Sequence, residues 1–471
     1  MSVLIRGGRI VTAADDYVAD LYVEDETIML IGESLDVHAD KVIDAAGKYV
    51  LPGCVDPHTH LDMPFGGTVT IDDVESGQTA AAFGGTTCHV DFIIQPQGQS
   101  FAATFEDWRS KATGKQMIDM GYHMAVTDLK EGGSLEELAT LPEQGITSYK
   151  LFMAYKGALM VDDETLFKTM EVAAKTGALV MVHAENGDVI DILVKEALAA
   201  GNTEPLYHAL TRPPEAEGEA TNRAIQLARL TGAPLYVVHV TCKEAVEPIA
   251  RARKDGWDVW GETCTQYFFT SLDDIAKPNF EGAKYVFSPP VRDASNHEVL
   301  WNAVRTDVLS VISTDHCAFL FDGQKTLGKD DFSKIPNGGP GLENRLQMIH
   351  EFGVRSGRIS LNRMVELLAT SPARLFGLYP RKGTVAVGSD ADLVVFDPEK
   401  QVTISASTQH SKVDYNLYEG TTVTGSPEVV LLRGQLLVEH DELVASPGIG
   451  QFVKRARFGK ELKPVAKTAR A

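Results

Sequence analysis

Two histidines one residue apart stand out near the start of the chain, in the stretch V-D-P-H-T-H-L-D of residues 55–62. They follow an apolar run at residues 49–55. If this run is a strand, alternate side chains share a face, so His58 and His60 lie side by side at its end. Two imidazoles in this arrangement suit a metal ion, although an isolated pair is also common as surface or core histidines. Further ligands elsewhere in the chain are needed to decide.

Other apolar runs deliver side chains that could complete a metal site. Lys150 lies in S-Y-K-L-F, His183 ends V-M-V-H, His239 ends V-V-H and Asp315 ends I-S-T-D. Each alone could be a satisfied polar group of the core. In a (β/α)8 barrel, however, the carboxyl ends of the strands converge on one face. The whole set exceeds the three or four protein ligands of one zinc ion and favours a pair of ions.

Lys150 is the unusual member of this set, because an ammonium would add positive charge where two dications already sit. Two dications, neutral imidazoles and Asp315 leave a charge of about +3, which a buried site does not tolerate well. We therefore predict that Lys150 is N6-carboxylated, because a carbamate supplies negative charge and two oxygens that bridge the metals. The alternative is a lysine that reaches the barrel mouth and pairs with an acid.

Apolar runs that alternate with helical patterns would position these residues. Helical patterns cover residues 162–176, 219–230 and 243–255. Near-continuous apolar strands between helices indicate a parallel sheet buried on both faces, and their number and spacing match a (β/α)8 barrel. An open doubly wound sheet would need an early glycine-rich phosphate turn, which is absent. The predicted strands are 54–60, 86–92, 121–126, 148–153, 178–184, 234–240, 258–268 and 308–315.

The two chain ends have a different pattern, with short strands broken by turns. We predict one small β-sandwich domain formed by residues 1–52 and 381–450, with the barrel at 53–380. Residues 451–471 are basic and weakly apolar, and we expect an arm that either crosses a subunit interface or is disordered. The expected strands of this domain are 3–6, 19–23, 27–31, 42–45, 383–385, 391–396 and 429–432.

Composition narrows the class of protein. The chain has 471 residues, 44% of them hydrophobic, and a formal net charge of −21. This charge argues against nucleic acid or an anionic membrane as a partner. The five cysteines form no C-x-x-C motif, which favours reduced thiols in a cytoplasmic protein. No apolar run approaches the roughly 20 residues of a membrane span, and the first residues do not resemble a signal peptide.

Several motifs occur together: V-D-P-H-T-H, S-Y-K-L-F-M-A-Y, V-M-V-H-A-E-N, Y-V-V-H-V and S-T-D-H-C. In order and spacing they resemble the motifs of the dihydropyrimidinase and D-hydantoinase branch of the amidohydrolase superfamily, and the resemblance covers essentially the whole chain. It implies a metal-dependent TIM barrel that opens 5,6-dihydropyrimidine or 5-substituted hydantoin rings to N-carbamoyl amino acids. A homotetramer acting on a small cyclic amide is also implied.

The resemblance also implies roles for the metal-site residues. His58, His60 and Asp315 would bind the more buried of two zinc ions. His183 and His239 would bind the other. Carboxylated Lys150 would bridge them, and Asp315 would act as general base and then as general acid.

Substrate-binding groups follow from the same resemblance. The Tyr155 hydroxyl would stabilise the developing oxyanion. Backbone groups of Ser288 and Asn337, in the turns F-S-P-P and I-P-N-G-G, would bond the imide edge of the ring. The pocket for the exocyclic substituent is expected to be lined by Met63, Phe65, Phe152 and Leu159.

Alternative functions within the superfamily remain. An allantoinase-like hydrolase of cyclic ureides differs little in these motifs. A non-catalytic relative used for protein interaction would have lost ligands, whereas all the ligand positions are filled here. Dihydroorotases carry H-x-H-x-R, whose arginine holds the substrate carboxylate; this chain has Asp62 at that place.

Overall fold

An eight-stranded parallel sheet forms the centre of the computed structural model, which describes residues 2–460. Its order is β15-β14-β13-β12-β11-β10-β9-β6. The first and last strands meet where Thr59 and His316 form a parallel bridge, so the sheet is a nearly closed barrel, as predicted. The strands are β6 (Cys54–Thr59), β9 (Thr86–Ile94), β10 (Asp119–Ala125), β11 (Ser148–Phe152), β12 (Leu179–His183), β13 (Leu235–Val237), β14 (Val259–Cys264) and β15 (Val311–Ser313).

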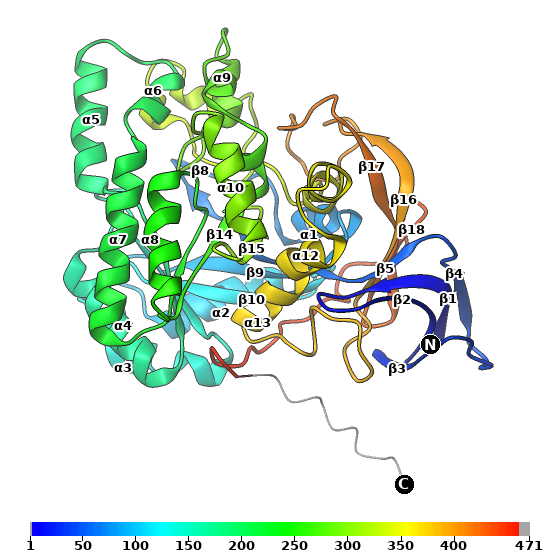
Figure 1. The fold of residues 1–471 in the computed structure, drawn as a ribbon. Coiled ribbons are helices and arrows are strands. Elements are labelled where there is room, and N and C mark those ends of the chain that lie inside the picture. The colour runs from blue at the N-terminus through cyan, green and yellow to red at the C-terminus, as the bar shows by residue number, and fades with distance from the viewer. Residues whose placement is uncertain (1, 461–471) are drawn as a thin grey trace.

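Helices surround the barrel and cover its outer face (Figure 1). In α4 (Asp163–Thr176), the Asp162 side chain caps the first turn, Gly177 ends the helix in the left-handed conformation, and one face buries Leu166, Met170 and Ala173. The other helices are α1 (Val74–Phe83), α2 (Phe101–Ala112), α3 (Leu135–Leu138), α5 (Gly187–Ala199), α6 (Leu206–Leu210), α7 (Pro214–Thr231), α8 (Lys243–Lys254), α9 (Leu272–Ile275), α10 (Ser295–Arg305), α11 (Arg345–Ile349), α12 (Leu361–Val365) and α13 (Ser371–Leu375).

A second, mixed sheet is built from both ends of the chain. Its nine strands run β19-β18-β17-β16-β5-β1-β2-β3, with β4 paired to β1. The two halves meet where β5 pairs with β16, for example at Leu51 and Val394. The strands are β1 (Ser2–Val11), β2 (Asp16–Glu24), β3 (Thr27–Gly32), β4 (Lys41–Asp44), β5 (Tyr49–Pro52), β16 (Leu393–Thr403), β17 (Thr422–Leu432), β18 (Gln435–Glu439) and β19 (Glu442–Leu443).

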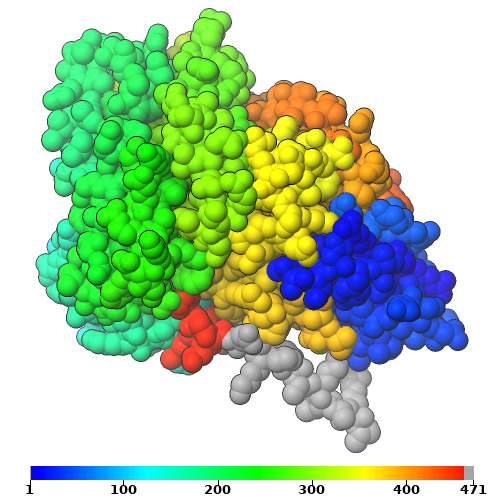
Figure 2. Space-filling model, viewed as in Figure 1, coloured from blue at the N-terminus to red at the C-terminus, as the bar shows by residue number. Residues whose placement is uncertain are grey.

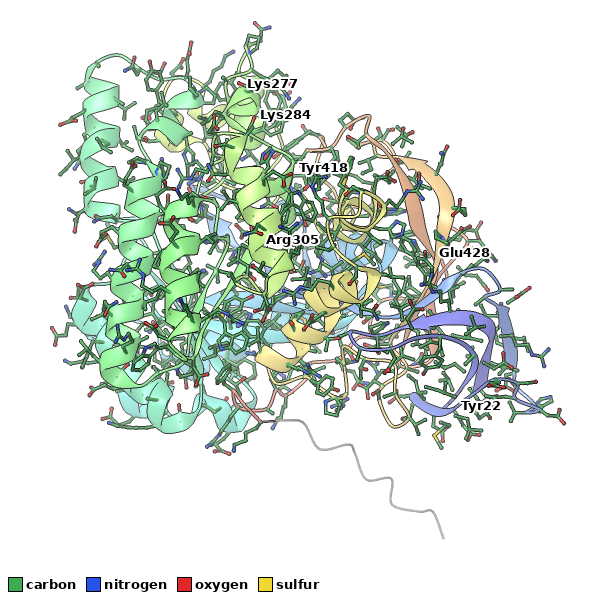
Figure 3. The ribbon with its side chains drawn as sticks, viewed as in Figure 1. Tyr22, Lys277, Lys284, Arg305, Tyr418 and Glu428 are labelled. Atoms are coloured by element: carbon green, nitrogen blue, oxygen red, sulfur yellow. The ribbon has the colours of Figure 1, made fainter. Side chains whose placement is uncertain are left out.

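This sheet lies beside the barrel, where the blue N-terminal segment and the orange segment from late in the chain adjoin (Figure 2). Tyr22 and Glu428 mark the sheet side, whereas Lys277 and Lys284 lie near α9, far from it (Figure 3). The expected strand at 383–385 was wrong: Gly383 has a φ of 80° there and its carbonyl accepts the Thr370 hydroxyl at 2.6 Å. The exact domain boundaries remain a prediction.

A buried charge cluster joins the barrel to the mixed sheet at the barrel's amino-terminal end. The Lys382 ammonium contacts the carboxylates of Asp119 and Asp392 at 2.6 and 2.7 Å, and Arg433 also pairs with Asp119. Burial disfavours the charge on Lys382, but the surrounding carboxylates outweigh burial and raise its pKa. These contacts make the barrel and the sheet depend on each other.

The last residues that the structure describes run along the same face of the barrel. The Val453 N–H donates to the Met120 carbonyl at 2.7 Å, and the Arg455 guanidinium donates to the Ser148 hydroxyl at 2.9 Å. Residues 461–471 of the predicted arm lie outside the described residues. Within residues 2–460, none of the helices combines the length and apolar character that a bilayer-spanning segment needs.

Candidate active site

A pocket lies at the carboxyl ends of the barrel strands, opposite the buried charge cluster. All of the predicted site residues line it, together with Ile94, Cys317 and Gly338. Its metal end contains the histidines, Lys150 and Asp315; its loop end contains Tyr155, Ser288 and Asn337. Their chemical roles remain predictions. The remaining predicted residues on the wall are Met63, Phe65, Phe152 and Leu159.

His58, His60 and Asp315 form a compact, buried group at the metal end. The Nε2 atoms of both histidines lie 3.1 Å from Asp315 Oδ1, and the possible ligand atoms are within 4.8 Å of one another. Burial opposes a charge on His58, but Asp315 and Glu262 raise its pKa to about 9. Burial lowers the pKa of His60 to about 4. Two imidazoles and a carboxylate aimed at one point are a donor set that fits a divalent metal ion.

The second histidine pair stands at the ends of neighbouring strands: His183 is the last residue of β12, and His239 follows β13 by two residues. His183 Nδ1 lies 3.0 Å from His239 Nε2. The Nδ1 atom of His239 is buried and has no hydrogen-bond partner among the described residues. Two ring nitrogens converging in this way also suit a shared ion. His239 and Asp315 both have positive φ angles, 41° and 50°, a conformation that is uncommon for non-glycine residues.

Two carboxylates behind the histidines were missed by the sequence analysis. Glu262 contacts His58 Nδ1 and accepts the Tyr236 hydroxyl at 2.9 Å; Glu185 lies 2.7 Å from His183 Nε2. A carboxylate on one ring nitrogen fixes the ring and leaves the other nitrogen facing the metal position. Both carboxylates also place negative charge near the metal end. The sum of charges that led to the prediction for Lys150 did not include them. The position of Glu185, two residues after His183, was the available signal.

Lys150 is 1% exposed and stands in an apolar setting. Its Nζ lies 5.0 Å from the ring centre of Phe92 and 5.2 Å from that of Phe152. No carboxylate of the described residues forms an ion pair with it, because Asp315 contacts the histidines instead. Burial lowers the pKa of Lys150 to about 7, against the opposing effect of Asp315. The predicted alternative, a lysine paired with an acid at the barrel mouth, is therefore not what the structure contains.

The loop end presents uncharged hydrogen-bonding groups. The Asn337 side-chain amide donates to the Ser288 hydroxyl at 3.0 Å. Among the described residues, the backbone N–H groups of Ser288 and Asn337 donate to no protein acceptor, and the Ser288 carbonyl accepts from no protein donor. Tyr155 has a φ of 67°, and burial raises the pKa of its hydroxyl, which keeps it a proton donor. These groups can bond a ligand.

Comparison with known proteins identifies the family. The model of the amidohydrolase family matches residues 49–437. The chain is 56% identical over 460 residues to a D-hydantoinase of Geobacillus stearothermophilus, covering 98% of both chains. It is 44% identical to a dihydropyrimidinase of Arabidopsis thaliana, covering 97% of this chain and 86% of that protein.

Solved structures agree with this relationship. A dihydropyrimidinase from Brevibacillus agri NCHU1002 superposes with a TM-score of 0.96 at 54% identity, covering 98% of this chain and all of that one. An L-hydantoinase from Arthrobacter aurescens superposes with a TM-score of 0.87 at 32% identity, covering 96% and 99%. The resemblance stated from the motifs is thus confirmed: the chain belongs to the D-hydantoinase and dihydropyrimidinase family of amidohydrolases.

Proposed function

We propose that this protein hydrolyses neutral cyclic amides, 5,6-dihydropyrimidines or 5-substituted hydantoins, to N-carbamoyl amino acids. One observation carries the proposal: a single pocket combines a buried His-His-Asp group with unpaired backbone donors and an acceptor. The first suits a metal that drives hydrolysis, and the second suits the alternating C=O and N–H groups of an imide edge. The names of the relatives, D-hydantoinase and dihydropyrimidinase, point to the same substrates.

We further propose two zinc ions per subunit, bridged by N6-carboxylated Lys150. His58, His60 and Asp315 would hold one ion, and His183 and His239 the other. The bound metal pair would supply an activated water and polarise the attacked carbonyl. Support for the carbamate comes from the buried amine of Lys150, which has no counter-ion among the described residues and whose pKa is lowered to about 7. A neutral amine is the form that reacts with carbon dioxide.

Asp315 and Tyr155 would handle protons and charge during the reaction. Asp315 would take the proton of the attacking water and return it to the ring nitrogen that leaves. The Tyr155 hydroxyl would donate a hydrogen bond to the carbonyl oxygen as negative charge develops there. Since burial raises the pKa of Tyr155, it stays protonated at neutral pH.

Orientation of the ring would come from the loop end and the apolar wall. Backbone groups of Ser288 and Asn337 would bond the imide edge. Beyond them an apolar wall would receive the exocyclic substituent; Phe65 and Tyr155 pack edge to face there, with ring centres 5.3 Å apart. The wall comprises Met63, Phe65, Phe152 and Leu159.

We also propose that the protein is a cytoplasmic homotetramer with no nucleic acid or membrane partner. All five cysteines are buried and unpaired, which suits a reducing compartment. The tetramer rests on the family resemblance, and light scattering coupled to size-exclusion chromatography measures it directly.

One assay series tests the proposed activity. The zinc-loaded protein is offered dihydrouracil, hydantoin, allantoin and dihydroorotate, and ring opening is followed by loss of ultraviolet absorbance and by product mass. Dihydrouracil or hydantoin should be opened, and prolonged chelation should remove the activity until zinc is returned. Preference for allantoin would favour the cyclic ureide alternative. Zinc-loaded protein that opens none of the rings would overturn the proposal in favour of a non-catalytic relative.

A further inference from the structure

Lys325 is fully buried, like Lys150 and Lys382, and the proposed catalytic groups do not include it. It begins a short helical turn (Lys325–Gly328) and is 0% exposed. Its Nζ donates three hydrogen bonds, to the carbonyls of Val286 at 2.9 Å, Pro336 at 2.8 Å and Gly338 at 2.6 Å. No carboxylate of the described residues pairs with it. A buried cation without a counter-ion is costly, so its retention calls for a specific reason.

The three acceptors belong to the two loops that form the loop end of the pocket. Val286 lies two residues before Ser288. Pro336 and Gly338 flank Asn337 on both sides. The Gly338 N–H also donates to the Val286 carbonyl at 2.9 Å, so this carbonyl joins the two loops directly as well as through Lys325. The ammonium therefore sits behind the backbone groups that face the pocket.

Gly338 fixes how closely these loops approach the barrel. Its φ is +147°, and a Cβ built on it would lie 2.1 Å from the Cys317 carbonyl oxygen. Only glycine fits this approach, which sets the loop against the residues that directly follow Asp315. A loop packed this closely has little freedom to turn its carbonyl groups toward solvent. A buried donor is therefore needed to satisfy these carbonyls with hydrogen bonds.

A lysine ammonium suits this task because it carries three N–H groups, and all three are used here. A neutral amine or an amide nitrogen would offer only two. A cation on the Pro336 carbonyl also polarises the Pro336–Asn337 peptide and strengthens its N–H as a donor. That N–H belongs to Asn337 and donates to no acceptor among the described residues.

We propose that Lys325 is the positioning residue of the two substrate-reading loops, holding Ser288 and Asn337 in register for the imide edge of the ring. The inference rests on the proposed function and adds a determinant of substrate affinity that lies outside the pocket wall. Lys325 touches neither the substrate nor the metal ligands; it acts through the loop backbones.

The substitution Lys325→Met tests this role, because methionine has a similar length and no donor. Loss of interactions made equally in the ground and transition states raises KM and leaves kcat nearly unchanged. We expect KM for dihydrouracil or hydantoin to rise about tenfold or more, with kcat within about threefold and zinc content unchanged. Lys325→Gln keeps two donors on a shorter side chain. It should show a smaller rise in KM, and it replaces the methionine variant if that protein does not fold.

The matched control is Lys334→Met, which removes an exposed lysine next to the same loop; its ion pair among the described residues is with Asp331, at 3.2 Å. It should behave like the wild type. Amide hydrogen exchange of residues 286–289 and 335–339 provides a readout without substrate: exchange should quicken in Lys325→Met and not in Lys334→Met. Hydrogen exchange needs no substrate, so it tests the role of Lys325 independently of the proposed activity. The proposed activity is refuted separately, if the wild-type protein opens no ring. The inference is overturned if Lys325→Met keeps the wild-type KM and exchange rates, or if it loses kcat together with zinc.

Discussion

One fully buried lysine, Lys150, lies at the metal end of the pocket and another, Lys325, lies behind its loop end, and the two have opposite surroundings. Burial lowers the pKa of both Lys150 and Lys325, but only Lys325 has hydrogen-bond acceptors that favour its charged form. Lys325 meets three carbonyl oxygens, whereas Lys150 faces the rings of Phe92 and Phe152. Three acceptors hold an ammonium in place, while an amine without them is free for chemistry. Burial alone therefore does not decide what a lysine does; the acceptors around it do.

The largest effect is expected from removing the amine at the metal end. Lys150→Ala should lower kcat/KM by at least about 10⁴-fold, because the proposed bridge that assembles the metal pair is lost. At least one zinc per subunit should be lost with it, measured by elemental mass spectrometry. Lys150→Arg should fail equally, since a guanidinium cannot form a carbamate.

A chemical rescue sharpens this prediction. Acetate or propionate added with zinc should restore part of the activity of Lys150→Ala, because a short carboxylate can occupy the bridging position. Full zinc occupancy and activity in Lys150→Arg would contradict the carbamate. So would a crystal structure in which electron density ends at a bare amine between two metal ions.

Asp315→Asn at the metal end should change kcat, whereas Lys325→Met behind the loop end should change KM. Asparagine keeps an oxygen ligand but cannot accept and return a proton. We therefore expect kcat to fall by about 10²–10⁴-fold with most of the zinc retained. This is the reverse of the KM effect expected at Lys325. Activity within a few-fold of the wild type would place the proton transfer on another group.

Dihydroorotate tests the uncharged character of the loop end. We expect its kcat/KM to be at least about 10²-fold below that of dihydrouracil, because none of the arginines within residues 2–460 lines the pocket. The sequence argument from Asp62 needs revision, since its carboxylate does not line the pocket and instead accepts the Val74 N–H at 3.2 Å. Turnover of both rings at similar rates would show that the loop end does not select for neutral edges.

The smallest effect is expected from changing Glu262, the carboxylate that contacts the proposed metal ligand His58. Glu262→Gln weakens the contact that orients His58, and zinc affinity should fall by about 10–100-fold in competition with a chelator. Glu298→Gln, which changes an exposed carboxylate on α10, is the control and should leave zinc affinity unchanged. Equal affinities in both variants would show that the metal end does not depend on Glu262.

The barrel and its metal residues could be predicted because buried parallel strands are continuous apolar runs, and a polar residue at the end of such a run is conspicuous. His183 and Asp315 were visible in this way. Glu262 was not, because it lies within a run that was expected to be a strand, and its contact with His58 depends on how strands face each other across the barrel.

Lys325 could not be predicted for a different reason. Its three acceptors are backbone carbonyls, which every residue carries, so no sequence pattern marks them. The stretch 383–385 shows the opposite error: a short apolar and polar alternation suggested a strand, but the left-handed conformation of Gly383 turns the chain there. Local pattern is informative for long buried elements and weak where tertiary contacts set the backbone.

The split construction of the mixed sheet has a consequence for synthesis on the ribosome. Strands β1 to β5 emerge first, but β5 finds its neighbour β16 only after the entire barrel has been translated. Until then the nascent chain carries an open sheet edge, and open edges recruit other strands. Asp119 is likewise synthesised long before Lys382 and Arg433, the cations that pair with its carboxylate in the folded protein. The mixed sheet and its buried charges are therefore completed only once Lys382, β16 and Arg433 have been made, and chains released before then would present an unpaired strand edge and an uncompensated buried acid.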